Sequence, residues 1–312
     1  MNDLKFSRGI RVSYVFLSIL VIFYHSGAND PGFLLYSHFT DSFFTSLRMP
    51  FYFFLGGLLL ERQSHHRDGT YILKSRFVHL IIPFLWFAPI YYFIETNFSN
   101  SDFRRPKSMI FSIIEPGYHL WFLPAFFLAV VIGLLQIKFI KSRYLETTFI
   151  IFLAILSISI KTDGDGLFAI YASIRMLPFL AAGILLSRTM FSLDSKIFRR
   201  KYAAWAVLIA VSLCTYYLKV GILTMLFTVP LIFLSLTFMK IPLRFHMLSN
   251  YTFQIYLFSP LGIGLSRYIL NLYDGVGVTQ KVFLNVLIGL TTTQIIVWAG
   301  RKYRLTSFLM GL

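Results

Sequence analysis

The sequence predicts an all-α protein, a polytopic bundle of about ten transmembrane helices. Hydrophobic residues make up 57% of the 312 residues and charged residues only 13%, whereas soluble domains carry about 25% charged residues. The mean hydropathy is +0.70. Apolar runs follow one another along the chain with short polar connections, so we expect a single membrane domain over residues 1–312 and no separate soluble domain.

Ten apolar segments can be delimited by the polar and Pro/Gly clusters between them. A bilayer core about 30 Å thick requires roughly 20 apolar residues in a helix. The predicted spans are 9–27, 38–60, 77–95, 119–139, 147–160, 167–188, 202–218, 220–239, 251–270 and 281–300. The fifth is short, and the seventh and eighth are separated by little more than Lys219 and Gly221, so the pattern is compatible with eight to eleven spans.

Basic residues predict the orientation of these spans, since Lys and Arg accumulate in cytoplasmic loops. With a cytoplasmic N-terminus, twenty Lys and Arg fall on the cytoplasmic face, six on the opposite face and three within spans. We therefore expect both termini in the cytoplasm. This bias and contact with anionic membrane lipids account for most of the net charge of +16, and we expect no nucleic-acid partner.

The first span ends in His25, which follows a long apolar run. An ionisable residue inside a membrane helix is expensive and marks a candidate functional site. Tyr14 and Arg11 lie 11 and 14 residues earlier, offsets that return to nearly the same helix face. A neutral imidazole can act as a general base, but a histidine that only hydrogen-bonds a neighbouring helix explains the residue equally well.

The third span begins with Arg76 and His79, three residues apart and therefore on one helix face. The topology places them at the cytoplasmic membrane boundary, where basic side chains can hold the phosphate groups of a cytosolic donor. The residues alone favour the simpler interpretation that both follow the positive-inside rule.

Four further residues are candidates for a pocket. Arg48 precedes Pro50 in the second span, within a segment whose glycine pair allows close helix approach. His119 and Trp121 open the fourth span, where interfacial anchoring is the default role for such residues. Arg175 is a second intramembrane cation, for which a structural salt bridge is the alternative, although few acids lie within spans.

Taken together, these segments resemble the acyltransferase type 3 family of integral-membrane acyltransferases. The resemblance rests on His25 at the end of the first helix, residues 76–79, residues 49–57, the run His-Leu-Trp-Phe-Leu-Pro at 119–124, and the Tyr-x-x-x-x-Tyr-Leu element at 251–257. It covers most of the chain, and residues 119–124 are its most specific part. Such enzymes move an acyl group, usually acetyl from acetyl-CoA, to a sugar hydroxyl of a surface polysaccharide or its lipid-linked precursor.

The resemblance implies roles for several residues. His25 would be catalytic, and Arg76 would belong to the donor-binding pair. This chain departs from the family where Tyr14 replaces a basic residue and where His79 is the second member of the pair. Arg11, one turn before Tyr14 on the same stripe, would compensate as a third donor-binding residue.

We therefore expect a membrane O-acyltransferase in a bacterial inner membrane, with acetyl-CoA as donor substrate. Neither a tightly bound cofactor nor a metal is expected. His25 would act as base or acyl relay, and the pocket would be formed by Tyr14, Arg48, His119, Trp121 and Arg175. The alternative is a transporter or exporter of a glycan precursor, in which the same polar residues would mark a substrate path.

Overall fold

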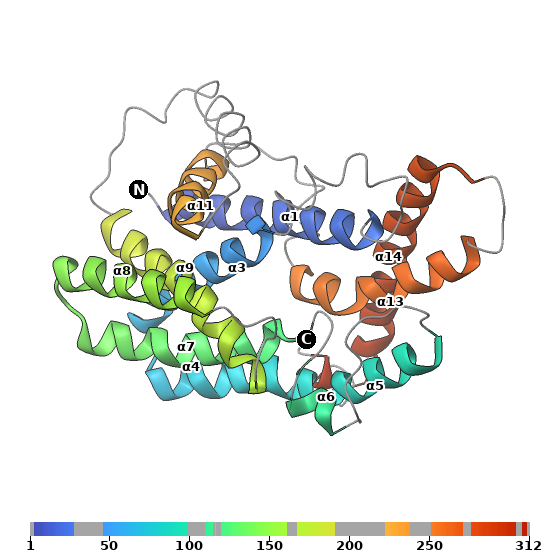
Figure 1. Ribbon diagram of the computed structural model, residues 1–312, viewed down its shortest axis with the longest axis horizontal. Helices are drawn as coiled ribbons and strands as arrows, with labels where there is room; N and C mark the ends of the chain where they lie inside the picture. The colour runs from blue at the N-terminus through green and yellow to red at the C-terminus, as the bar shows by residue number, and fades with distance from the viewer. Residues whose placement is uncertain are drawn as a thin grey trace. The chain divides into compact units, whose positions relative to one another are not determined.

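The computed structural model shows an all-α protein (Figure 1). It describes residues 3–27, 46–98, 110–114, 116, 120–160, 167–190, 222–237, 251–270, 276–303 and 308–310, and these residues contain no strand. The helices are α1 (Asp3–Gly27), α3 (Ser46–Ser64), α4 (Gly69–Arg76), η3 (Phe77–Ile81), α5 (Ile82–Phe98), α6 (Phe111–Ile114), α7 (Phe122–Phe139), α8 (Arg143–Ser159), η4 (Leu167–Ala169), α9 (Ile170–Met190), α11 (Ile222–Thr237), α13 (Thr252–Leu270) and α14 (Val278–Arg301). The predicted all-α class is confirmed for the described residues.

Five helical segments in the described part of the chain are long and apolar enough to cross a membrane. They are Ser7–Ser26, Gly69–Phe93, Phe122–Phe139, Leu167–Thr189 and Val278–Arg301. Helices also cover the predicted spans 38–60 (from residue 46), 147–160, 220–239 and 251–270, almost to their ends, whereas 202–218 lies outside the described residues. The chain is therefore an integral membrane protein, and ten spans with cytoplasmic termini stay predictions.

The third predicted span differs from the observed helix at its start. Hydropathy places the boundary at residue 77, but the helix begins at Gly69 and continues through Arg76. An apolar run marks only the part of a helix that contacts lipid, so the charged first turns of α4 were missed. The segment that carries Arg76 is consequently helical and continuous with the apolar part of the span.

A π-helical turn, η3, interrupts this helix just before Pro83. The backbone N–H of Ile82 donates to the carbonyl of Phe77, five residues earlier. Proline has no N–H and its ring would clash with the carbonyl four residues before it, which is that of His79. The wider turn accommodates the proline and changes the register of the side chains, and such π-bulges are frequent at functional sites. His79 lies in this turn.

Backbone contacts divide the chain into two compact units. Unit 1 comprises Met1–Tyr52 and Met190–Gly300, and unit 2 comprises Phe53–Thr189 and Arg301–Leu312. The first seven residues of α3 thus count with unit 1 and the remainder with unit 2. The expectation of a single domain stays a prediction.

Small residues bring the helices of unit 1 close together. Helix α1 packs against α11 and α13, and a Cβ on Gly9 would lie 2.4 Å from Thr237 Cγ2. Between α13 and α14, a Cβ on Gly262 would lie 2.6 Å from the Thr292 hydroxyl. Glycine permits this close approach, as is typical of helix packing in membranes.

Unit 2 is built around the second half of α3, which packs tightly against α9. A Cβ on Gly57 would lie 2.0 Å from the carbonyl oxygen of Leu180, and one on Gly183 would lie 2.1 Å from that of Phe54. Neither position can hold a larger residue without separating the two helices. The close approach expected at the glycine pair of α3 is therefore present.

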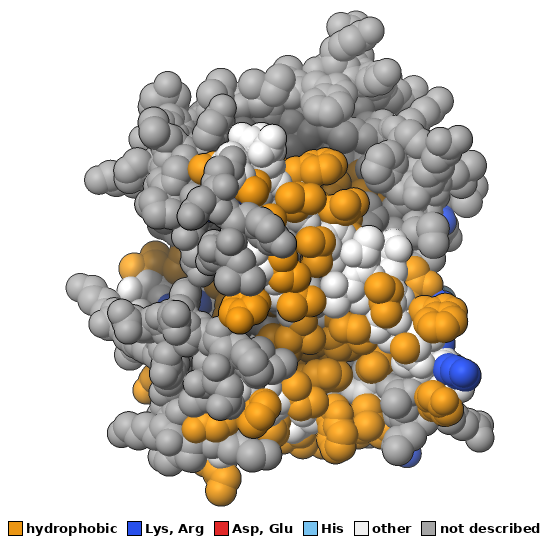
Figure 2. Space-filling model, turned by 90° about the vertical axis from the view of Figure 1, so that its right-hand side faces the viewer, with side chains coloured by type: hydrophobic (Ala, Val, Ile, Leu, Met, Phe, Trp, Pro, Cys, Tyr) orange, Lys and Arg blue, Asp and Glu red, His pale blue; other side chains and the backbone are white. Residues whose placement is uncertain are grey.

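Large hydrophobic side chains also lie on the outside of the protein. Figure 2 shows a face on which hydrophobic side chains cover most of the described surface and Lys and Arg are few. On α14, Phe283, Ile295 and Trp298 are 67%, 63% and 75% exposed. Such a surface fits contact with lipid acyl chains.

Candidate active site

His25 lies in the last turn of α1, in unit 1, beside a guanidinium and an aromatic ring. Arg48 of α3 places its Nη1 3.4 Å from His25 Nε2, and its guanidinium carbon lies 3.7 Å from the centroid of the Tyr24 ring. The Tyr24 and His25 rings meet edge to face at 5.3 Å. Because a guanidinium has only donors, Nε2 is the acceptor in this contact, and we assign the ring proton to Nδ1.

Three tyrosines form an aromatic cluster in the same unit. The ring centroids of Tyr14 and Tyr52 are 6.5 Å apart, and those of Tyr52 and Tyr256 are 6.4 Å apart. Nearby, the Ser18 hydroxyl donates to that of Thr252 at 3.0 Å. Helices α1, α3 and α13 therefore meet through aromatic and hydroxyl contacts that include the predicted pocket residue Tyr14.

Two residues that the sequence analysis assigned no role contact the end of α1. Arg267 of α13 donates a hydrogen bond to the carbonyl of His25, and Asn285 of α14 donates one to the carbonyl of Ser26 at 3.1 Å. Arg267 was counted only as a charge within a span. An arginine and an asparagine in apolar helices were the available signal, but their partners depend on tertiary packing.

The predicted donor-binding pair, Arg76 and His79, lies in unit 2, and the two side chains contact different groups. Arg76 Nη2 donates to the Gln63 side-chain oxygen at 3.0 Å, whereas His79 Nδ1 lies 2.6 Å from the carbonyl of Ser75. Nδ1 must be the donor there, because a carbonyl only accepts. The expectation that both residues share one α-helical face does not hold across the π-helical turn, which changes the angular spacing.

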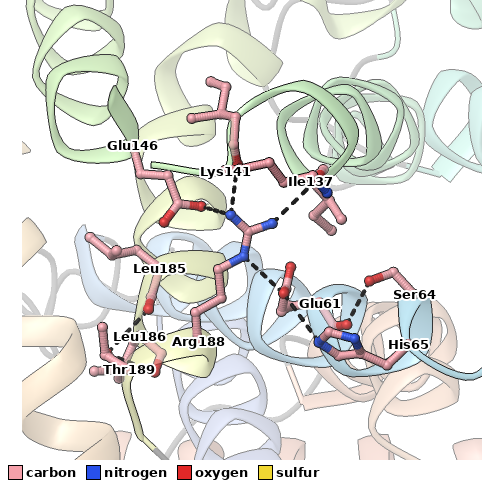
Figure 3. A network of polar contacts seen from close by, with 11 residues as sticks. Glu61, Ser64, His65, Ile137, Lys141, Glu146, Leu185, Leu186, Arg188 and Thr189 are labelled. Atoms are coloured by element: carbon pink, nitrogen blue, oxygen red, sulfur yellow. Dashed lines mark hydrogen bonds and ion pairs between the residues drawn. The ribbon is translucent and has the colours of Figure 1, made fainter. Parts of the chain in front are cut away.

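An ionic cluster in unit 2 joins four helices around Arg188, near the end of α9 (Figure 3). Its guanidinium bonds Glu61 of α3 at 2.8 Å, Glu146 of α8, and the carbonyls of Ile137 and Ile140 at the end of α7. Both carboxylates are buried. Burial raises the pKa of Glu146, which precedes the apolar part of α8, and Arg188 opposes that rise.

Sequence reasoning missed this cluster because Arg188 fits the positive-inside pattern. Glu61 and Glu146 lie at the ends of their apolar runs, where acids attract little notice. The contacts join residues up to 127 positions apart, and no local spacing reveals such a pairing. His65 also contacts Glu61, at 3.4 Å.

The other predicted site residues are placed as follows. Arg11 is exposed and its Nε donates to the carbonyl of Ser7 at 3.4 Å. Trp121 lies just before α7, half-buried, with its ring 6.5 Å from that of Phe122. Arg175 of α9 is half-buried. His119 lies outside the described residues.

The structure thus brings His25 and Arg48 together in unit 1, with Tyr14 in the adjoining aromatic cluster. Arg76, His79, Trp121 and Arg175 belong to unit 2. Each unit therefore contains ionisable side chains among apolar helices. In an integral membrane protein, such side chains mark candidate functional sites.

A family model described as an acyltransferase domain matches residues 15–301, and the chain therefore belongs to the acyltransferase type 3 family. It is a membrane acyltransferase that uses an acyl donor and an acceptor. The match begins just after Tyr14 and includes His25 and Arg76. No curated protein and no solved structure matches the chain at a significant level.

Proposed function

We propose that this membrane acyltransferase is an O-acetyltransferase, with acetyl-CoA as donor and a sugar hydroxyl of a cell-surface polysaccharide, or its lipid-linked precursor, as acceptor. We place it in a bacterial inner membrane. The observation that carries the proposal is the contact between His25 and Arg48, which puts an accepting imidazole nitrogen beside a guanidinium among apolar helices. The family match supports the acyl-transfer chemistry.

His25 would act on the acceptor hydroxyl. Nε2 carries the lone pair of the imidazole in the tautomer that the Arg48 contact requires. The contact of 3.4 Å is long for a hydrogen bond, so an incoming hydroxyl can compete for the lone pair. The hydroxyl proton would then pass to Nε2, which is general-base work.

The acyl transfer itself balances without another reactant. The hydroxyl oxygen attacks the thioester carbonyl carbon, the carbon–sulfur bond breaks, and the departing thiolate takes up the proton held by His25. The products are an ester and free CoA. Arg48 would stabilise negative charge on the carbonyl oxygen during attack, since preorganised donors contribute strongly in a water-poor site.

Arg76 would be the principal donor-binding residue, through its guanidinium and the phosphates of CoA. A guanidinium always carries its charge and can bind phosphate in a bidentate manner. His79 uses Nδ1 on the carbonyl of Ser75, so its Nε2 can donate to a phosphate only when the ring is doubly protonated. We therefore assign His79 a minor part, with Arg11 as a further donor-binding residue.

The remaining predicted residues would contact the donor or the acceptor. Tyr14 is half-buried and packs in the cluster with the buried Tyr52 and Tyr256, and its ring and hydroxyl would contact a sugar or the pantetheine arm. Trp121, Arg175 and His119 would orient donor or acceptor. Correct orientation lowers a barrier only when the reacting atoms are held close together.

The test is acetyl transfer by the purified full-length chain in lipid vesicles. With radiolabelled acetyl-CoA and a membrane glycan fraction, we expect label in the glycan, and mass spectrometry should find one acetyl group per modified sugar. Glycans from a deletion strain should lack that group. Movement of unmodified glycan across the vesicle membrane without label transfer would instead support the exporter.

A further inference from the structure

Helix α1 carries His25 in its last described turn. Two main-chain carbonyls of this turn, those of His25 and Ser26, accept hydrogen bonds from side chains of other helices. Side-chain donors commonly satisfy carbonyls near the end of a helix. The position of His25 therefore depends in part on donors supplied by other helices.

Two helices supply these donors. Arg267 of α13 bonds the carbonyl of His25, and Asn285 of α14 bonds the carbonyl of Ser26 at 3.1 Å. Asn285 and Ser26 are 3% and 1% exposed, so lipid and water cannot replace this contact. The cation of Arg267 is also favourable at the negative end of the α1 dipole.

We propose that Arg267 and Asn285 are positioning residues, which hold the main chain of α1 so that the His25 imidazole faces Arg48 and the acceptor. This inference rests on the proposed function. Both bonds go to consecutive main-chain carbonyls, at His25 itself and at the next residue, so they fix the Cα–Cβ direction from which the ring projects. A displacement of 1 Å in such a site can reduce a rate by about 10²-fold.

The inference predicts a specific kinetic pattern. Asn285→Leu and Arg267→Met remove the donors with little change in size, and each should lower kcat about tenfold to hundredfold. Donor KM should stay within about twofold, because the proposed phosphate ligand Arg76 belongs to the other unit. Arg267→Lys keeps a cationic donor and should recover a substantial part of kcat.

A matched control is available on α14. Thr293 is buried like Asn285, but its hydroxyl donates within its own helix, to the carbonyl of Gly289 at 2.8 Å. Thr293→Val should therefore keep the wild-type kcat. Equal losses in Thr293→Val and Asn285→Leu would show a general packing defect and would overturn the inference.

A second measurement does not depend on activity. In full-length protein labelled with ¹⁵N-histidine in lipid nanodiscs, the His25 ring signals can be assigned by their loss in His25→Gln. We expect the wild type to show the Nδ1–H tautomer, and Asn285→Leu and Arg267→Met to show a mixture of tautomers. Unchanged His25 signals in both variants would overturn the inference even if their activity fell.

The two measurements separate this inference from the proposed function. If the wild type transfers acetyl and His25→Ala does not, while Asn285→Leu and Arg267→Met both keep the wild-type kcat, the positioning role is wrong and the function stands. If the wild type transfers no acetyl group, the function fails, and the ring signals still decide whether Arg267 and Asn285 hold His25. Should Arg267→Met fail to fold, Asn285→Leu carries the test, and a wild-type kcat together with unchanged His25 ring signals in that variant would overturn the inference.

Discussion

Arg188 and Arg48 are both guanidinium groups in apolar surroundings, and their partners differ. Arg188 bonds two carboxylates and two main-chain carbonyls in unit 2. Arg48 lies against an imidazole and a tyrosine ring in unit 1. Among the described residues, no carboxylate lies within salt-bridge distance of Arg48.

Under the proposed function, this difference separates a structural cation, Arg188, from a cation that takes part in acyl transfer, Arg48. The charge of Arg188 is compensated by Glu61 and Glu146, and the same bonds hold the ends of four helices together. Among the described residues, the charge of Arg48 is met only by neutral groups. Under the proposed function, this guanidinium would attract a thioester carbonyl or a developing oxyanion. Stability and activity should accordingly depend on different residues, which mutations can test.

The largest effect is expected at His25. His25→Ala should reduce acetyl transfer about 10²–10⁴-fold, the usual contribution of a general base, and should leave the Tm of the purified protein nearly unchanged. His66→Ala is the control, because that histidine is exposed. A folded His25→Ala variant that kept more than about a tenth of the wild-type rate would exclude His25 as the base.

At Arg188 the loss should be in stability. Arg188→Met leaves two buried carboxylates without their cation, and breaking a buried ion pair from one side typically costs about 3–5 kcal/mol. We expect a large fall in Tm, with kcat of the surviving folded fraction near the wild-type value. Glu146→Gln should cost less, since Arg188 retains Glu61. A stable Arg188→Met variant with low kcat would show that Arg188 serves activity and not stability.

Continuous apolar runs were sufficient to predict the all-α class and most of the described helices, because lipid demands long apolar segments whatever their packing. They failed at Gly69, where a polar helical extension precedes the apolar run. At the site, His25 and Arg48 were identifiable as ionisable residues within apolar runs. Two features could not be identified from the sequence: the hydrogen bonds from Arg267 and Asn285 to the end of α1, and the Glu61–Arg188–Glu146 cluster. Each joins residues that are distant in sequence, through packing that hydropathy does not encode.

A variant of Arg76 tests whether this guanidinium, which lies outside the cluster around Arg188, binds the phosphates of the acyl donor. One of its partners is the neutral amide of Gln63, and a charge-assisted phosphate contact is worth about 1.5–3 kcal/mol. Arg76→Ala should therefore raise the KM for acetyl-CoA about tenfold to hundredfold, with a smaller effect on kcat. Lys74→Ala, on the same helix and exposed, is the control. An unchanged donor KM would show that Arg76 does not bind the donor and only follows the positive-inside rule.

The smallest effect is expected from His79→Arg, which would restore the basic pair that the family resemblance implies. His79 is exposed and lies in the π-helical turn, so a longer side chain can be accommodated without displacing a buried neighbour. Arginine is charged at every physiological pH, whereas His79 must first gain a second proton to donate from Nε2. The variant should therefore lower the donor KM several-fold. An unchanged donor KM would place His79 outside the donor site and leave Arg76 to bind the phosphates without it.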